Sequence, residues 1–450
     1  MFNLSDTICA ICTPKGSGAI SAIRISGSDS WSIAQKIFFQ KTESEVPEPR
    51  LQHMHALHGY IKDNKKIIDE VILLPFKSPN SFTAEDTIEI FCHGGLQVTS
   101  QILDICLKNG AGQAKAGEFT FRAFINGRID LTEAEAINEI ISADNEKAAY
   151  VASEILSGSL KKKISNFREK LFELITQIES SVEFPMDVPD TSNEEIISNL
   201  KNIKLEINKL IESSKEGQII RDGIKVSIIG PPNAGKSSLL NQLLESERAI
   251  VSEEPGTTRD TIEEKIILDG WPVVLIDTAG IRDKALSDSE KFGIERSKST
   301  VQKSDIVLAV FDILNKKEEE FSLLLKDKPK IFVGNKIDLM NGKSVDKNGY
   351  DVLISAKIGT NIDKLKSLLI EKIKPLLNTQ YFSINQRQKE LLVQCNYAID
   401  NSINFTDKNM SEDLISDELK NAISKLDEIS GRAVSDAVIQ NIFAKFCIGK

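Results

Sequence analysis

The feature that most constrains the fold is a glycine-rich octapeptide, Gly230-Pro-Pro-Asn-Ala-Gly-Lys-Ser237, which directly follows the apolar run Lys225–Ile229. The pattern G-x-x-x-x-G-K-[ST] needs a strand before it and a helix after it, because its backbone N–H groups wrap around phosphates. A helical pattern follows at Ser238–Leu244. Lys236 would reach the β- and γ-phosphate oxygens, and the Ser237 hydroxyl would bind Mg²⁺. The motif therefore predicts a nucleotide-binding α/β domain.

Two motifs that can respond to a γ-phosphate follow in the expected order. Pro255-Gly-Thr-Thr258 is a candidate first switch, in which Thr258 can sense the γ-phosphate through Mg²⁺. Asp277-Thr-Ala-Gly280 follows a strand-like run, which would place Asp277 beside the metal ion and the Gly280 N–H near the γ-phosphate.

The nucleotide base is predicted by Asn335-Lys-Ile-Asp338, which follows another strand-like run. The Asp338 carboxylate can accept hydrogen bonds from two guanine N–H groups, a pairing that adenine cannot offer. Ser355-Ala-Lys357 would support the base from the other side. Four motifs in this order favour GTP over ATP.

One departure from Ras-like GTPases concerns the water that attacks GTP. Ras-like proteins carry a Gln after Asp-Thr-Ala-Gly, whereas this chain has Ile281, which cannot hydrogen-bond water. Another group of the chain, or a partner, must orient the water. Asn233 offers a side-chain carbonyl next to the phosphates, where a monovalent cation could stand in for an arginine finger. The alternative, that Asn233 only packs within the loop, is equally compatible with the sequence.

Hydrophobic periodicity divides the 450 residues into three regions. Residues 1–118 alternate short β-rich runs with turns, which predicts a small α+β domain. Residues 119–219 and 376–450 have a helical period, which predicts one discontinuous α-helical domain. Residues 220–375 alternate strands with helices, which predicts a parallel sheet with crossover helices, inserted between the helical halves. The expected fold class is thus multidomain α/β with an inserted P-loop domain.

The same periodicity predicts individual elements. The expected strands are Thr7–Ile11, Ala19–Ile25, Val71–Leu74, Thr87–Phe91, Ile224–Ile229, Val273–Ile276, Ile306–Phe311, Lys330–Val333 and Val352–Ser355. The expected helical stripes are Leu160–Val182, Ile196–Leu210, Leu414–Ile429 and a last short helix at Val438–Phe446.

The net charge and the cysteine content limit how this chain could bind RNA or metal ions and in which compartment it works. The net charge of −10 provides no general positive field, so RNA would need a local basic surface or a partner. Lys161-Lys162-Lys163 with Arg168 is such a surface, or simply a solvated helix face. Six scattered cysteines indicate a reduced, intracellular protein. The pair Cys9/Cys12 and the group His53, His55 and His58 could hold a metal ion, but strands with satisfied side chains are the simpler interpretation.

The first residues, Met-Phe-Asn-Leu-Ser-Asp6, resemble neither a signal nor a transit peptide, and no apolar run reaches membrane-spanning length. We therefore expect a cytoplasmic, bacterial protein without membrane contact.

Further characteristic stretches occur along the whole chain: Asp6-Thr-Ile, Thr13-Pro-Lys-Gly16, Arg24-Ile-Ser-Gly27, Phe82–Ile90 with Cys92-His-Gly-Gly95, Ala116–Leu131, Gly293-Ile-Glu-Arg296, Leu426–Gly431 and the terminal Phe446-Cys-Ile-Gly-Lys450. In these stretches and in the GTPase motifs the sequence resembles the MnmE (TrmE) family of tRNA modification GTPases over its whole length.

The resemblance implies a folate-binding-like N-terminal domain that forms a homodimer and takes a tetrahydrofolate derivative, in the 5,10-methylene or 5-formyl form, as one-carbon donor. It implies a potassium-activated G domain that also binds Mg²⁺. It further implies a heterotetramer with an FAD-dependent partner of the MnmG (GidA) type. Together they would install an aminomethyl or carboxymethylaminomethyl group on carbon 5 of the tRNA wobble uridine.

The resemblance also implies site residues. Folate would contact Arg24, Glu89, Arg128 and Lys450, with Arg128 standing where Lys is common. The K⁺ ligands would be Asn233, Ser252, Glu254 and Thr257, and the Mg²⁺ ligands Ser237 and Thr258. The catalytic residues would be Glu290, which positions water, and Cys447, a thiol proposed for the modification chemistry. The expected GTP-binding residues are Asn233, Ala234, Gly235, Lys236, Ser237, Ser238, Ser252, Glu253, Glu254, Pro255, Gly256, Thr257, Thr258, Asp277, Thr278, Ala279, Gly280, Asn335, Lys336, Asp338, Ser355, Ala356 and Lys357.

Two other functions remain open from the sequence. One is a GTPase switch of ribosome assembly without modification chemistry, although the chain shows no RRM aromatics and no KH-type clamp. The other is a folate-dependent transferase whose GTPase only regulates it.

Overall fold

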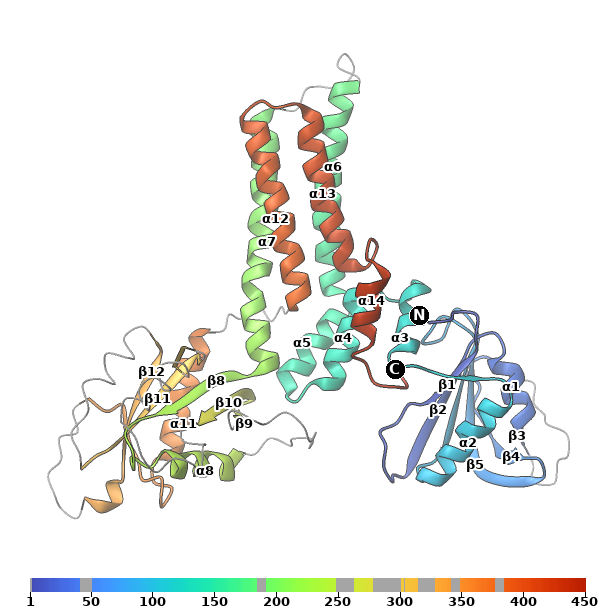
Figure 1. Cartoon of the computed structure of the whole chain (residues 1–450), viewed down its shortest axis with the longest axis horizontal. Coiled ribbons are helices and arrows are strands. Elements are labelled where there is room, and N and C mark those ends of the chain that lie inside the picture. The colour runs from blue at the N-terminus through green and yellow to red at the C-terminus, as the bar shows by residue number, and fades with distance from the viewer. Residues whose placement is uncertain are drawn as a thin grey trace. The chain divides into compact units, whose positions relative to one another are not determined.

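The computed structural model describes residues 2–40, 51–183, 192–247, 263–277, 301–302, 304–314, 328–340, 349–376 and 384–450. The chain forms two compact units (Figure 1). Unit 1 consists of Met1–Asn138, Ile155–Phe172 and Ile423–Lys450, and unit 2 of Glu139–Glu154 and Glu173–Ala422.

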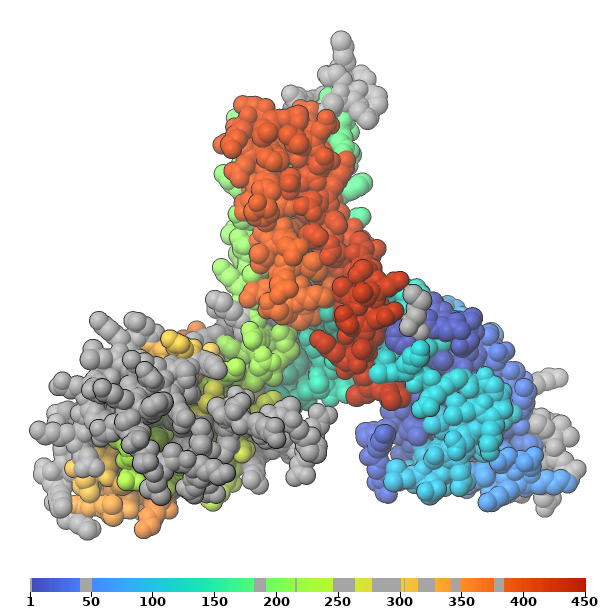
Figure 2. All heavy atoms as spheres, viewed as in Figure 1, coloured from blue at the N-terminus to red at the C-terminus, as the bar shows by residue number. Residues whose placement is uncertain are grey.

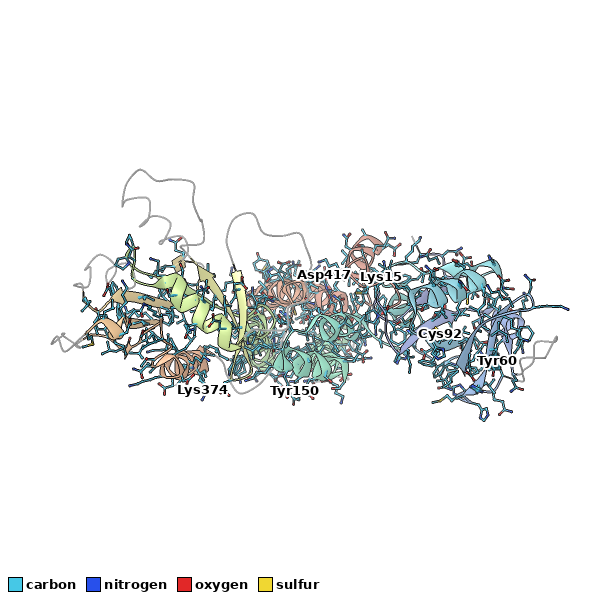
Figure 3. All side chains as sticks on the ribbon, turned by 90° about the horizontal axis from the view of Figure 1, so that it is seen from below. Lys15, Tyr60, Cys92, Tyr150, Lys374 and Asp417 are labelled. Atoms are coloured by element: carbon cyan, nitrogen blue, oxygen red, sulfur yellow. The ribbon has the colours of Figure 1, made fainter. Side chains whose placement is uncertain are left out.

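Unit 1 contains a seven-stranded sheet in the order β3-β4-β5-β6-β2-β1-β7. Its strands are β1 (Ile8–Ile11), β2 (Ile20–Ser26), β3 (Phe38–Phe39), β4 (Leu57–Asp63), β5 (Lys66–Phe76), β6 (Thr87–His93) and β7 (Gly112–Gln113). β1 and β7 are parallel, and the other pairs are antiparallel. Tyr60 on β4 and Cys92 on β6 are labelled in Figure 3. The four strands expected here are confirmed, and β5 is longer than its expected core Val71–Leu74.

Alternation along β2 and β6 explains why this sheet has two different faces. Ile23 and Ile25 are fully buried in one core with Ile88 and Ile90, under helices α1 (Ser30–Ile37) and α2 (Leu96–Lys108). In the space-filling view the atoms of α2 lie over this face (Figure 2). Residues between these isoleucines point to the opposite face, where the sheet meets α3 (Glu118–Ile125) through Phe119.

Helical stripes account for most of the remaining core. The helices are α4 (Leu131–Ser142), α5 (Glu146–Leu156), α6 (Ser159–Glu183), α7 (Asn193–Asp222), α12 (Gln386–Asp407), α13 (Glu412–Ser430) and α14 (Asp436–Phe443). The expected stripe of α7, from Ile196 to Leu210, is buried throughout. The stripe expected for α13 is wrong at its first member, because Leu414 is 41% exposed and Ile415 is buried instead. The last helix begins and ends earlier than expected, and Val438 is exposed.

Unit 2 contains a six-stranded sheet in the order β13-β12-β11-β8-β10-β9. Its elements are β8 (Ile224–Ile229), α8 (Lys236–Glu247), β9 (Glu263–Leu268), β10 (Trp271–Asp277), β11 (Ile306–Asp312), β12 (Lys330–Asn335), the 3₁₀ turn η1 (Ile337–Leu339), β13 (Val352–Leu353), α11 (Ile362–Ile373) and η2 (Lys374–Leu376).

The five strands expected here pair in parallel, as predicted, but the sequence analysis missed an edge strand, β9, which pairs antiparallel with β10. Asp269 and Gly270, both with positive φ (51° and 76°), form the two-residue turn between these strands. Asp-Gly is a strong hairpin signal, since both turn positions need positive φ. The boundaries expected between three domains stay a prediction.

The metal alternatives from the sequence find no support in the described residues. Within the described ranges no group of three or more His, Cys, Asp or Glu side chains could hold a metal ion. Cys9 is a buried residue of β1, as the strand interpretation predicts. Of the three histidines only His58 lies in a strand, where it pairs with Glu70 at 2.7 Å. In the described part of the chain, no helix is long and apolar enough to span a membrane.

Candidate functional site

The phosphate-binding loop lies between β8 and α8, as the octapeptide predicts. Both glycines of the motif are sterically required. A Cβ at Gly230 would lie 2.0 Å from the carbonyl oxygen of Val310, and one at Gly235 would lie 2.2 Å from Asn335 Nδ2. Since β8 is central and buried, the loop is held against the carboxyl ends of its neighbouring strands, the usual ligand edge of such a sheet.

The polar side chains of the loop lie at its open side. Lys236 Nζ donates to the carbonyl oxygens of Gly230 (2.9 Å) and Pro231 (2.8 Å), so its ammonium group is held across the loop. Ser237 is exposed in the first turn of α8, beside Lys236. Asn233 is exposed and left-handed, with φ of 63°, a conformation that Asn tolerates better than most residues. These positions fit phosphate and cation binding.

Asn335 joins three of the sequence motifs. Its side chain is buried, and its Nδ2 donates to the Ala234 carbonyl oxygen of the phosphate loop at 2.8 Å. Its Oδ1 accepts from the backbone N–H groups of Lys336 (2.8 Å) and Ala356 (2.9 Å). One amide thus connects the phosphate loop, the base motif and the loop after β13.

The carboxylate that is predicted to recognise the base is oriented by a residue of a second motif. Asp338 Oδ1 accepts from the Ser355 hydroxyl at 2.5 Å, and Ser355 itself is fully buried. Lys336 Nζ donates to Asp312 Oδ2 at 2.9 Å, which holds the lysine stem along the edge of this region. A hydrogen-bonded, oriented carboxylate is what pairing with two guanine N–H groups requires.

Part of the predicted GTPase set lies outside the described residues. This part comprises Ser252, Glu253, Glu254, Pro255, Gly256, Thr257, Thr258, Thr278, Ala279, Gly280, Glu290 and the side chain of Asp277. The structure brings together the phosphate loop, Asn335, Asp338 and Ser355, and the roles assigned to the others stay predictions.

Unit 1 holds a second group of predicted site residues, on the sheet face opposite α1 and α2. The antiparallel register of β2 and β6 places Arg24 directly across from Glu89. Arg24 donates from Nε (2.9 Å) and Nη2 (2.8 Å) to the same Glu89 oxygen. Both side chains are mostly buried, with 15% and 19% exposed, so this ion pair is better shielded than a surface pair.

Aromatic rings lie under the two arginines of this face. The Arg24 guanidinium carbon lies 4.6 Å from the centroid of the Phe82 ring and 5.5 Å from that of Phe119. Arg128 lies 5.0 Å from the same Phe82 ring and donates to the Phe82 carbonyl oxygen at 3.0 Å. Partial burial and, secondly, the charge of Arg24 lower the pKa of Arg128, which places the two cations in one electrostatic environment.

The C-terminal residues lie on the same face. A Cβ at Gly449 would lie 2.3 Å from the Ile11 carbonyl oxygen, so only glycine allows this approach to β1. The Lys450 carbonyl oxygen accepts from Phe119 N at 3.2 Å. Burial raises the pKa of the half-buried Cys12 thiol, while the positive charges of Arg24 and Lys450 oppose that rise. Lys450 and Arg24 thus act electrostatically on the same thiol.

Cys447 is exposed, so its thiol does not pack against the end of α14. Its carbonyl oxygen accepts from Gly117 N at 3.3 Å, which fixes the backbone of the tail beside α3.

We name Arg24, Glu89, Arg128 and Lys450 the cationic cluster. The structure pairs Arg24 with Glu89 and brings Arg24 and Arg128 to the same Phe82 ring, while the charge of Lys450 acts on the same Cys12 thiol as that of Arg24. Such a set suits an anionic ligand that can accept several charge-assisted hydrogen bonds. The sequence interpretation missed Phe82, Phe119 and Cys12 as neighbours of the cluster. Phe82 lies in a quoted motif, but no pattern showed that its ring supports arginines.

Comparisons with known proteins address the whole chain. Residues 7–128 match the family model described as the GTP-binding protein TrmE N-terminus, and residues 131–447 match that of the MnmE helical domain. The expected fold class, with an α+β N-terminal domain, a helical domain and an inserted P-loop domain, is thereby confirmed. A solved structure, the G domain of the T. maritima iron transporter FeoB, is 24% identical over 33% of this chain and 98% of that chain. Its TM-score of 0.24 is too low for any conclusion.

Three full-length relatives of this chain share the same name. A protein of Thermotoga petrophila is 38% identical over 99% of this chain and 100% of its own length, and one of Fervidobacterium nodosum is 40% identical over 99% and 98%. A protein of Thermoanaerobacter pseudethanolicus is 39% identical over 99% of both chains. All three are named tRNA modification GTPase MnmE. This chain therefore belongs to the MnmE family of tRNA modification GTPases.

Proposed function

We propose that this chain hydrolyses GTP in order to drive a modification of tRNA at carbon 5 of the wobble uridine. The observation that carries the proposal is the presence of two unlike sites in one chain. One is the hydrogen-bonded set of Asn335, Asp338 and Ser355, which fits guanine, and the other is the cationic cluster, which suits an anionic cofactor. A simple GTP-dependent switch would need only the first.

The metal ions of this proposal fit the described residues of the phosphate loop. The exposed Ser237 hydroxyl would bind Mg²⁺ together with Thr258, and the exposed Asn233 side chain would bind K⁺ together with Ser252, Glu254 and Thr257. When bound, the two cations would neutralise charge that develops on the phosphates. Glu290 would orient the attacking water, so Glu290→Ala should slow hydrolysis while leaving GTP affinity unchanged. An equal loss of GTP affinity would contradict that role.

The cationic cluster fits a tetrahydrofolate derivative, in the 5,10-methylene or 5-formyl form, through the acidic groups of that molecule. Arg24, Arg128 and Lys450 would bind its carboxylates, and Glu89 would hold Arg24 in place and accept from the ligand's ring N–H groups. When bound, the cofactor would supply the one-carbon unit that is transferred.

The proposal includes partners. The chain would act as a homodimer formed through its N-terminal domain, in a heterotetramer with an FAD-dependent protein of the MnmG type, on tRNA. The group installed would be aminomethyl or carboxymethylaminomethyl. The relatives of this chain are named for tRNA modification, which supports the substrate class.

This function can be tested by mass spectrometry of the tRNA nucleosides of a strain from which the protein has been deleted. We expect modified wobble uridines to disappear and to return when the wild-type chain is supplied. Normal wobble uridines together with accumulating precursor rRNA would contradict the proposal and favour a ribosome-assembly switch.

The same strain tests Cys447. We expect Cys447→Ser to leave GTP hydrolysis normal and to prevent recovery of the modified uridine, because the exposed thiol would act in the modification chemistry. Normal modified uridine with this variant would make Cys447 dispensable.

A further inference from the structure

Phe82 supports both arginines of the cationic cluster on one ring. Arg24 lies 4.6 Å and Arg128 5.0 Å from the same ring centroid, and Arg128 is also bonded to the Phe82 carbonyl oxygen. Two guanidinium groups repel each other, and burial together with, secondly, the nearby charge of Arg24 lowers the pKa of Arg128. The electron-rich ring face offsets part of this repulsion, because each cation is attracted to it.

The segment that carries Phe82 is anchored to α3 by a buried ion network. Arg122 is fully buried and donates to Glu85 (3.1 Å), to Glu118 (3.2 Å) and to the Asn3 carbonyl oxygen (3.1 Å). Breaking such a buried network by removing one partner is strongly destabilising, so the network fixes the segment firmly.

Two further hydrogen bonds fix the backbone on either side of Phe82. The Ser81 hydroxyl donates to the Glu85 carbonyl oxygen at 2.6 Å, and Asn126 Nδ2 donates to the Thr83 carbonyl oxygen at 2.8 Å. Phe119, the second ring beneath Arg24, lies on the same helix as Arg122. Both rings therefore belong to one rigid part of unit 1.

We propose that Phe82 is a positioning residue of the cationic cluster: its ring sets the separation and direction of Arg24 and Arg128, so that their donors meet one anionic ligand together. Glu89 takes two of the five N–H donors of Arg24, so the others can face that ligand. This role rests on the proposed function, because the anionic ligand is the tetrahydrofolate derivative proposed there.

The experiment compares Phe82→Leu with Phe82→Tyr in the full-length chain. Leu keeps an apolar side chain of similar size but removes the aromatic face, whereas Tyr keeps it. Phe39→Leu is the matched control, because Phe39 also carries a cation, with Lys62 Nζ 4.4 Å from its ring, and belongs to the edge strand β3. The first readout is calorimetric binding of 5-formyltetrahydrofolate.

The second readout needs no ligand. The Nε–H NMR signals of Arg24 and Arg128, assigned by substitution, report a ring-current shift while a ring lies under the guanidinium. Phe82→Leu should abolish the shift of Arg128 and reduce that of Arg24, which retains Phe119. Phe82→Tyr and Phe39→Leu should preserve both shifts.

In the binding experiment we expect Phe82→Leu to weaken the probe about tenfold or more, since two cation–ring contacts are lost. Phe82→Tyr and Phe39→Leu should bind like the wild type. Unchanged affinity or unchanged arginine signals in Phe82→Leu would overturn the positioning role, as would an equal loss in Phe82→Tyr. If the wild-type chain fails to bind the probe, the folate proposal falls, and the arginine signals alone decide the role of Phe82.

Discussion

The nucleotide site of unit 2 and the cationic cluster of unit 1 are held together by different forces. In unit 2 a buried amide, Asn335, joins three backbone segments through hydrogen bonds of 2.8 to 2.9 Å. In unit 1 the strand register sets the pair Arg24–Glu89, and aromatic rings support the charges. Hydrogen bonds lose strength sharply with misalignment, whereas the attraction of a cation to a ring tolerates small displacements. We therefore expect the nucleotide site to be more sensitive than the cationic cluster to small displacements of its side chains.

The largest difference between the two sites should appear when K⁺ is replaced by Na⁺. If Asn233 holds a potassium ion beside the phosphates, GTP hydrolysis should slow by about 10³-fold, the scale of an arginine-finger effect. Binding of 5-formyltetrahydrofolate to the cationic cluster should not change. Equal hydrolysis rates in the two salts would remove the ion from the nucleotide site.

A smaller effect is expected from Asp338→Asn. The variant loses the charged acceptor for two guanine N–H groups, so GTP affinity should fall by about a hundredfold. Affinity for xanthosine triphosphate should rise, because its 2-oxo group accepts from the new amide. Asp363→Asn, a change at a fully exposed carboxylate of α11, is the control. Nucleotide titrations in which Asp338→Asn behaves like the control would refute the base assignment.

The smallest expected effect is on stability, from removing a cation–ring contact within unit 2 that is of the same kind as the contacts of Phe82. Lys147 Nζ on α5 lies 3.1 Å from the Trp271 ring centroid, and Lys265 is bonded to Asp144 at 2.8 Å beside it. Lys147→Ala should lower the free energy of unfolding by about 0.5 to 2 kcal/mol. Denaturant titration against Lys364→Ala, an exposed lysine of α11, measures it. If the two variants are equally stable, the contact contributes nothing.

The sequence predicted the elements best where one physical signal acted alone. The 3.6-residue period of α7 and the glycine spacing of the phosphate loop each determine a local structure. It missed β9 although Asp269-Gly270 marks the hairpin, because the run Glu263–Leu268 begins with charged residues that resemble a loop. The exposed Leu414 shows that period alone does not say where a buried stripe begins.

The candidate sites were predicted unequally for a related reason. Motifs give the residues of the nucleotide site directly, since each motif is contiguous. Phe82, Arg24 and Arg128 come from separate segments that meet only through the strand register and the network of Arg122. No sequence spacing encodes such a meeting, so the supporting ring became visible only in the structure.

The central claim is that one chain combines GTP hydrolysis with a separate anionic-cofactor site in order to modify tRNA. The most direct test supplies the Arg24→Ala variant to a strain from which the wild-type protein is missing. Lys108→Ala, a change at an exposed cation of unit 1, is the control. We predict that purified Arg24→Ala hydrolyses GTP normally, that it no longer binds 5-formyltetrahydrofolate, and that its cells lack modified wobble uridine. Wobble-uridine levels equal to those of the control strain would contradict the account.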